Sequence, residues 1–474
     1  MTNWDQEQLN RDARELEKLG YNQELLRGLG GFSNFAVAFS VVSILTGISQ
    51  LYGYGLQHGG PSQMFWGWIL VGFFTLIVSL AMAELASAYP TAGALYHWSS
   101  FLGGRTVGWF TACFNAIGMF AILAGIDYGL AKFLIPLLHL PNQTWVVNVL
   151  YAFLLFSHAF LNYRGIKWVS WLNDFSAVYH VVVVAILIGA LAFKGFHQPL
   201  RFLNHFHATD GFSPSYSFII GLLLAQWTLT GYDASAHVTE ETIDPGRRAP
   251  WGIFFAVVLS LFSGLFMLMA VTLSIPDLAE FTAKGDSAFL EIFRFNLGDG
   301  FGSLVVGLCA GAMWLCGLAG MTSASRMVFA FARDKGLPMS HWLAKVDENY
   351  KTPAPAIWAL AIFALVLAFS VSIYSAVVSI ATVALYISYG LPIATRLWAR
   401  LNRKHEKIGP WNLGKFSTLV SILAVGWVSF ITIVFMLPPN EQAGQVMGIL
   451  FLILIFLWGF YVRHRYVGPK YHET

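Results

Sequence analysis

The chain has 474 residues, of which 57% are hydrophobic and only 11% are charged, and its net charge is +3. Soluble globular proteins carry about 25% charged residues, so this composition predicts an integral membrane protein and excludes an ordinary soluble domain. The small net charge argues against a nucleic-acid partner. The three cysteines all lie in apolar runs, which predicts neither a disulfide framework nor a metal site.

The chain begins with a polar, charged segment, which we expect to be a tail and not a cleaved signal peptide. Windows of about 20 residues then predict twelve apolar membrane spans. Their limits are 30–57, 64–88, 105–137, 144–162, 170–193, 214–243, 250–275, 301–331, 355–373, 375–396, 416–437 and 443–463. The connector 276–300 is expected to hold a short amphipathic helix, because Phe289, Ile292 and Phe293 recur at helical spacing.

Lys and Arg are unevenly distributed between the two sides that these spans define. If the chain begins in the cytoplasm, the outer segments contain few of the 28 Lys and Arg residues. The outer ones are Lys132, Lys194, Arg201, Lys284 and Arg294. Because positively charged loops stay in the cytoplasm, we expect both termini there, in a multi-pass protein of the cell membrane.

Two spans are interrupted in corresponding ways. The sixth span contains Gly231 and Asp233 within 227–241, where a membrane helix should continue, and the first span is rich in glycine and polar residues over 43–60. A carboxylate at such depth is costly unless it is paired, hydrated or protonated. The two spans lie five apart, so they cross the membrane in opposite directions. Broken helices in matching positions of two inverted halves indicate the central site of a transporter.

A broken helix exposes amides at the start of its second half and carbonyls at the end of its first, and these ends attract a carboxylate and an ammonium. Two such breaks therefore suit a zwitterion, with Tyr232 as a ring that could face an ammonium. The predicted substrate-binding residues are Ser43, Ile44, Thr46 and Gly47 in the first break and Trp227, Thr230, Gly231 and Tyr232 in the second. The alternative is that the small residues only let helices pack closely.

Several motifs in register resemble one family over nearly the whole chain. The run from Ala83 to Trp98 resembles the span 2 to span 3 motif of the amino acid–polyamine–organocation transporters. Residues 231–241, 325–338 and 351–355 are similar to the same superfamily, and with 389–396 they are most similar to its amino acid/choline branch, which includes GABA and choline permeases.

The resemblance implies an all-α membrane fold with twelve spans: five plus five inverted spans, with spans 1 and 6 broken, followed by two peripheral spans. The implied parts are a cytoplasmic tail 1–28, the first repeat 29–199, the second repeat 213–396, a cytoplasmic loop with the last two spans 397–465, and a cytoplasmic tail 466–474. It also places Thr46 and Gly47 on the carboxylate-binding turn. Leu45 stands where the family usually has glycine, so a strict preference for α-amino acids is not implied.

Three ionisable residues within the predicted spans are candidates for a functional role. Asp233 corresponds to an acidic position that is linked to proton coupling in some relatives; it is expected either to titrate or to cap the second half-helix. His180 falls where a lysine of proton-coupled cationic amino acid permeases replaces a sodium ion. It is expected to carry a proton or to pack between helices. Asp127 is expected to face a cationic substrate or to pair with Lys132.

The acidic pair Glu240 and Glu241 lies near the inner end of the sixth span. One interpretation is an inner gate formed with Arg247 and Arg248, which follow closely in sequence. We expect a solvated helix end instead, because exposed ion pairs are common and weak.

The leading functional hypothesis is a secondary active transporter that takes up an amino acid or a small amine such as GABA, choline or a polyamine by alternating access. A proton is expected as the coupling ion in preference to sodium, and no other cofactor. An enzyme is not expected, since no nucleophile and base pattern or phosphate loop appears. An exchanger of the same fold is the nearest alternative. A non-transporting amino acid sensor is a different class, and the short tails argue against it. Substrate identity, stoichiometry and oligomeric state do not follow from the sequence.

Overall fold

The computed structural model describes residues 6–370, 374–402 and 406–469, with side chains outside 367–376. The first residues of the predicted N-terminal tail and the last of the C-terminal tail lie outside this part. The long helices are α2 (Gly31–Val42), α3 (Ile44–His58), α5 (Trp68–Ala88), α6 (Leu95–Leu137), α7 (Thr144–Tyr163), α8 (Ile166–Lys194), α12 (Pro245–Leu273), α15 (Asp299–Arg333), α17 (Ala354–Ser370), α18 (Tyr374–Leu401), α19 (Ser417–Val434) and α20 (Glu441–Phe460). The short ones are α1 (Gln6–Lys18), α4 (Gly60–Ser62), α9 (Pro214–Gly221), α10 (Leu223–Thr228), α11 (Ala234–His237), α13 (Leu278–Ala283), α14 (Ala288–Leu297) and α16 (Ser340–Leu343).

The chain folds as a bundle of helices, and no strand occurs in the part of the chain that the structure describes. Ten helical segments there are long and apolar enough to cross a membrane. Two predicted spans are not among the ten. The first, 214–243, is divided into the short helices α9, α10 and α11; the second, 355–373, corresponds to α17 and ends among residues outside the described part.

The boundaries of the other long spans lie within five residues of the predicted ones, and α6 differs most. The predicted span begins at residue 105, whereas the helix begins at Leu95 and is kinked at Gly104, whose φ of 83° is left-handed. Polar residues between Leu95 and the kink lower the average hydropathy there, so the predicted apolar span did not include this stretch. The expected amphipathic helix in the connector is confirmed as α14, which buries Phe289, Ile292 and Phe293.

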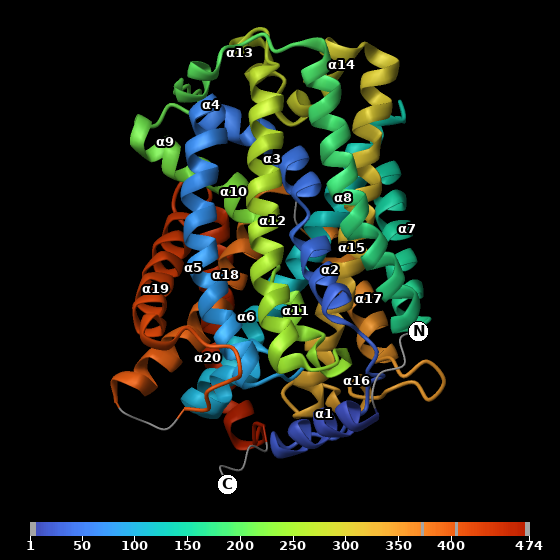
Figure 1. Cartoon of the computed structure of the whole chain (residues 1–474), viewed down its shortest axis with the longest axis vertical. Helices are drawn as coiled ribbons and strands as arrows, with labels where there is room; N and C mark the ends of the chain where they lie inside the picture. Colours follow the sequence, from blue (N-terminus) through green and yellow to red (C-terminus); the bar gives the residue numbers. More distant parts are fainter. Residues whose placement is uncertain (1–5, 371–373, 403–405, 470–474) are drawn as a thin grey trace.

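The broken first span, α2 and α3, occupies the centre of the bundle and is almost wholly buried. Helix α12 packs against α2 and α5, while α6 packs against α15 and α18. Helix α20 lies outside and exposes apolar side chains such as Leu452 and Phe460. Helices α1 and α16 lie toward one end of the bundle, and α4, α9, α13 and α14 lie toward the other (Figure 1).

Candidate functional site

The first helix break is a single residue, Ser43, between α2 and α3. Its φ of 21° and ψ of 84° interrupt the helix, and its carbonyl oxygen accepts hydrogen bonds from the amides of Thr46 and Gly47 at 3.0 and 3.1 Å. The two amides predicted to bind a carboxylate are thus engaged within the turn. A bound carboxylate would have to share them with the Ser43 carbonyl or displace it.

The second break separates α10 from α11 and contains Gly231. Its φ of 102° is left-handed, and a Cβ at this position would overlap Val41 of α2. Its amide donates to the Tyr389 hydroxyl of α18 at 3.3 Å. Only glycine meets both the backbone conformation and the close approach.

The two breaks touch each other. A Cβ on Gly47 would lie 2.7 Å from Thr228 Cα, so α3 and α10 meet backbone to backbone. Beside this contact is a closed cavity of about 10 Å³, which is roughly the room that one water molecule needs. It is lined by Val41, Val42, Ser43, Thr46, Gly47, Ile122, Ile126, Trp227, Thr228, Thr230 and Cys316.

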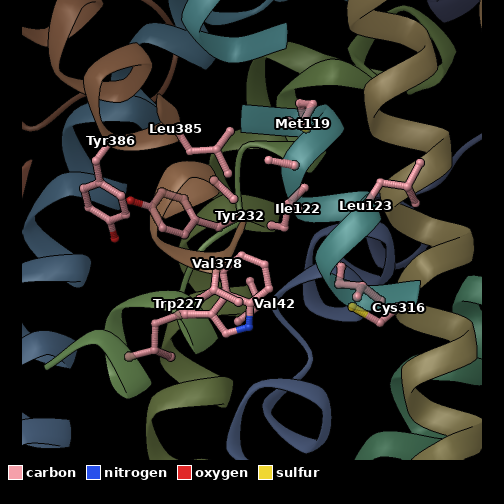
Figure 2. Packing of buried hydrophobic residues seen from close by; sticks show 14 of the residues in the cluster. Val42, Met119, Ile122, Leu123, Trp227, Tyr232, Cys316, Val378, Leu385 and Tyr386 are labelled. Carbon is pink, nitrogen blue, oxygen red and sulfur yellow. The ribbon is translucent and has the colours of Figure 1, made fainter. Parts of the chain in front are cut away.

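Five of the eight predicted substrate-binding residues line this cavity, and Figure 2 shows Val42, Trp227 and Cys316 around it. Ile44, Gly231 and Tyr232 do not belong to the lining. Tyr232 is fully buried, with its ring 5.3 Å from that of Tyr389. The sequence reasoning missed the wall formed by Ile122 and Cys316, because α6 and α15 have no break there to mark it.

Alanine at Gly47 or Gly231 is expected to disable the site. Either Cβ would overlap atoms of a neighbouring buried segment, and overpacking of this kind costs about 1–3 kcal/mol. Both variants should melt at a lower temperature and lose transport. Gly189→Ala is the control, since its Cβ would meet nothing within 4 Å. Equal stability and transport for all three variants would show that the close approach does not matter.

A much larger opening lies on the side of the cavity that faces away from α1 (Figure 1). It has a volume of about 750 Å³ and is bordered by α3, α6 and α14. Gln50 and Tyr128 are among its lining residues. We call this opening the vestibule. The side chain of Gln50, which lines the vestibule, donates at 3.4 Å to the carbonyl of Ile126, which lines the cavity.

On the other side, two ion pairs close the bundle. Glu241 binds Arg326 through two hydrogen bonds of 2.9 and 3.1 Å, with both side chains fully buried. Glu240 binds Arg333 in the same manner at 2.7 and 3.0 Å. The expectation of a solvated helix end is therefore wrong. Both partners come from α15, and neither is one of the arginines that follow in sequence.

The N-terminal segment also contributes to this closure. The Asp334 carboxylate accepts hydrogen bonds from the hydroxyls of Tyr21 and Tyr96 and lies 3.0 Å from His97 Nε2. Burial alone would raise the pKa of Asp334, but the bond from His97 and the nearby Arg333 charge hold that pKa below its usual value. The tail is thus fastened to α6 and α15 by a charged carboxylate.

Asp233 does not cap α11, as one alternative expected, because its side chain makes no capping hydrogen bond. One carboxylate oxygen accepts from the Tyr389 hydroxyl at 2.7 Å, and the other lies 3.3 Å from His237 Nε2. His237 Nδ1 lies 3.0 Å from the Ala92 carbonyl, which can only accept, so Nδ1 carries a hydrogen. Nε2 faces the carboxylate without forming a hydrogen bond, and neither Nε2 nor Asp233 Oδ2 has a hydrogen-bond partner among the described residues.

His180 is tied to the first break. Its Nδ1 donates to the Ser176 carbonyl at 2.8 Å, which leaves Nε2 to accept from the Ser43 hydroxyl at 2.7 Å. Ser43 Oγ is also 2.6 Å from Thr46 Oγ1. With a neutral imidazole, both nitrogens of His180 are therefore hydrogen-bonded. A protonated imidazole would donate from Nε2 to Ser43 Oγ, and the Ser43 hydroxyl would then donate to Thr46 Oγ1.

Asp127 lies behind the cavity wall and not on it. It is fully buried and pairs with His158 at 3.2 Å, whereas Lys132 lies 3.6 Å from Asp286. The structure therefore does not pair Asp127 with Lys132, as one alternative expected. Contact with a cationic substrate stays a prediction, and it would require the turn at Ile126 to move. Within the described residues, no three His, Cys, Asp or Glu side chains gather as metal ligands would.

Comparison with known proteins decides the family. Residues 29–460 match the family described as amino acid permease. The chain belongs to the amino acid permease family. A protein of Oryza sativa subsp. japonica named amino-acid permease BAT1 homolog is 37% identical to this permease, covering 96% of this chain and 94% of its own. Amino-acid permease BAT1 of Arabidopsis thaliana is also 37% identical, over 96% and 95% of the two chains. A GABA-specific permease of Saccharomyces cerevisiae is 29% identical, over 91% of this chain and 79% of its own.

Family membership confirms the resemblance found in the sequence motifs. The permease is a multi-pass membrane protein of the amino acid transport class, and a transporter rather than an enzyme.

Proposed function

We propose that this permease takes up an amino acid or a related small amine together with a proton, by alternating access. The observation that carries the proposal is the Asp233–His237 pair beside the second helix break. Asp233 Oδ2 and His237 Nε2 lie 3.3 Å apart, neither has a hydrogen-bond partner among the described residues, and Tyr389 links Asp233 to the Gly231 amide. An acid and an imidazole placed in this way can share a proton. A proton site adjoining a zwitterion site is what proton-coupled uptake requires.

The proposed architecture has twelve spans in two inverted repeats, 29–199 and 213–396, followed by two peripheral spans. The paired breaks at Ser43 and Gly231 support it. The exposed outer face of α20 supports a peripheral place for the last span. We place both termini in the cytoplasm and the permease in the cell membrane, as the Lys and Arg distribution predicts.

The substrate is proposed to bind in the cavity between the breaks. Its carboxylate would take the amides of Thr46 and Gly47, and its ammonium the carbonyls of Trp227 and Thr230, with the ring of Tyr232 nearby. The name of the yeast GABA-specific permease supports an amine with a carboxylate at some distance. Because the cavity has a volume of only about 10 Å³, its walls must separate before such a molecule enters.

The side from which the substrate enters is proposed from what lies on each side of the cavity. The 750 Å³ vestibule reaches Gln50, one turn from Thr46, whereas the buried Glu241–Arg326 pair closes the opposite side. We therefore assign this conformation to an occluded state nearest the outward-facing one. Release inside would require the two ion pairs with α15 to separate, as the broken helices move against the rest of the bundle.

Uptake in proteoliposomes tests the coupling. With one proton carried per substrate, a one-unit pH gradient, acid outside, should support accumulation up to about tenfold. The substrate is first chosen by a thermal-shift screen over amino acids, GABA, choline and polyamines. Flux that ignores the pH gradient but follows sodium or an internal counter-substrate would reject proton symport.

The same experiment separates the two alternatives. An exchanger would move labelled substrate only when substrate is present on both sides. A sensor would give a thermal shift with no flux under any gradient.

A further inference from the structure

A second carboxylate–imidazole pair lies away from both helix breaks, between α6, α7 and α15. Asp127 Oδ2 is 3.2 Å from His158 Nδ1, and both side chains are fully buried. Within the described part of the chain, neither Asp127 Oδ1 nor His158 Nε2 has a hydrogen-bond partner. Buried polar atoms are normally paired, so two unpaired ones in a single contact call for an explanation.

The facing helix leaves room for the pair. A Cβ on Gly317 of α15 would overlap Asp127 and lie 2.5 Å from His158 Cε1. The indole of Trp314, on the same helix, lies 5.3 Å from the His158 ring, centroid to centroid. The helices are thus shaped around an ionisable pair in an otherwise apolar region.

Residues next to the pair in sequence line both openings of the permease. Ile126, next to Asp127, lines the closed cavity, as does Cys316, next to Gly317. Tyr128, on the other side of Asp127, lines the vestibule. Water that fills the vestibule therefore contacts Tyr128, which is next to Asp127 in sequence. It would reach the pair if the turn at Ile126 released its bond to Gln50.

The charge of the pair links proton binding to closure. With a neutral imidazole and an ionised carboxylate the pair carries one negative charge, which is costly to bury within a membrane. One added proton makes the pair neutral overall. The neutral form is therefore the less costly one to enclose when the outer side closes.

The described ionisable groups that interact electrostatically with Asp127 include Tyr151 on α7 and Cys316 on α15, and both are neutral in their ordinary forms. Residues 354–366 of α17, which packs against α6 and α7, include no ionisable side chain. Lys132, one turn further along α6, lies at the rim of the vestibule beside Asp286.

We propose that Asp127 and His158 form a proton-binding site that is loaded from the vestibule, and that the permease closes its outer side over substrate only when this site holds its proton. The inference rests on the proposed proton coupling. The proton comes from water in the vestibule, and the only bond that forms in the protein is the one to this proton.

The test is the dependence of initial uptake on external pH, at fixed internal pH, with the amino acid selected by the thermal-shift screen. In the wild type, uptake should rise as the outside becomes more acid. Asp127→Asn and His158→Gln should each give a flatter profile than the wild type. The exchanged pair, Asp127→His with His158→Asp, keeps one carboxylate and one imidazole and should recover the pH dependence. Asp174→Asn is the control, because it removes a half-buried carboxylate that bonds Ser33 on α2.

The outcomes separate this inference from the proposed function. If the wild type shows no dependence on the pH gradient, proton coupling itself is rejected and the inference falls with it. If the wild type is coupled, and Asp127→Asn lowers uptake by one common factor with the pH profile unchanged, the pair has only a packing role and the inference alone is overturned.

Discussion

Arg326→Met is expected to destabilise the permease by about 3–5 kcal/mol, because removal of one partner of a buried ion pair leaves the other charge unpaired. Arg326 and Glu241 are both fully buried and joined by two hydrogen bonds. Arg326 also contacts Asn162 at 3.3 Å, so α7 loses a contact as well. The measurement is the midpoint of thermal unfolding of the purified protein in detergent.

A double variant identifies the cause. Arg326→Met combined with Glu241→Gln removes both charges and should recover much of the lost stability. The matched control is Arg247→Met, because Arg247 is exposed and lies 3.9 Å from the half-buried Asp244. Ion pairs of this kind at the surface are worth only about 0–1 kcal/mol. If Arg326→Met loses no more stability than Arg247→Met, the pair is not a closure of the inner side.

Asp233→Asn is expected to abolish accumulation driven by a pH gradient while exchange of substrate continues. The asparagine amide can donate to His237 Nε2 where the shared proton would lie, and its oxygen can still accept from the Tyr389 hydroxyl. The variant thus imitates the protonated form permanently and should fold normally. Accumulation under a one-unit gradient should fall from about tenfold to the level of simple equilibration.

Two comparisons make this prediction decisive. Tyr389→Phe keeps the ring and the carboxylate but removes the hydroxyl, so it should weaken coupling without eliminating it. Asp174→Asn should leave coupling as in the wild type. Full proton-driven accumulation by Asp233→Asn would mean that this carboxylate has a structural role only.

Most of the fold could be predicted from the sequence, because apolar runs of about 20 residues have few uses other than crossing a membrane. The breaks could be located as well, since Gly231 and Asp233 interrupt such a run. The error at Glu240 and Glu241 has a physical reason: their partners on α15 lie 93 and 85 residues away in sequence. Proximity along the chain pointed to Arg247 and Arg248 instead.

The parts of the site that the sequence did not predict come from unbroken helices. Thr228 and Cys316 sit in apolar runs with nothing to mark them as cavity residues. His158 and His237 are single histidines whose carboxylate partners depend on how the helices pack. Asp127 and Asp233 were recognised as ionisable, but their imidazole partners required the three-dimensional structure.

The difference in size between the vestibule and the cavity has a pharmacological consequence. A molecule that fits a space of about 750 Å³ can bind from the outside without ever fitting the closed cavity of about 10 Å³. Such a compound would block the permease and not be carried by it. Bulky analogues of the substrate should therefore act as inhibitors that compete from one side of the membrane only.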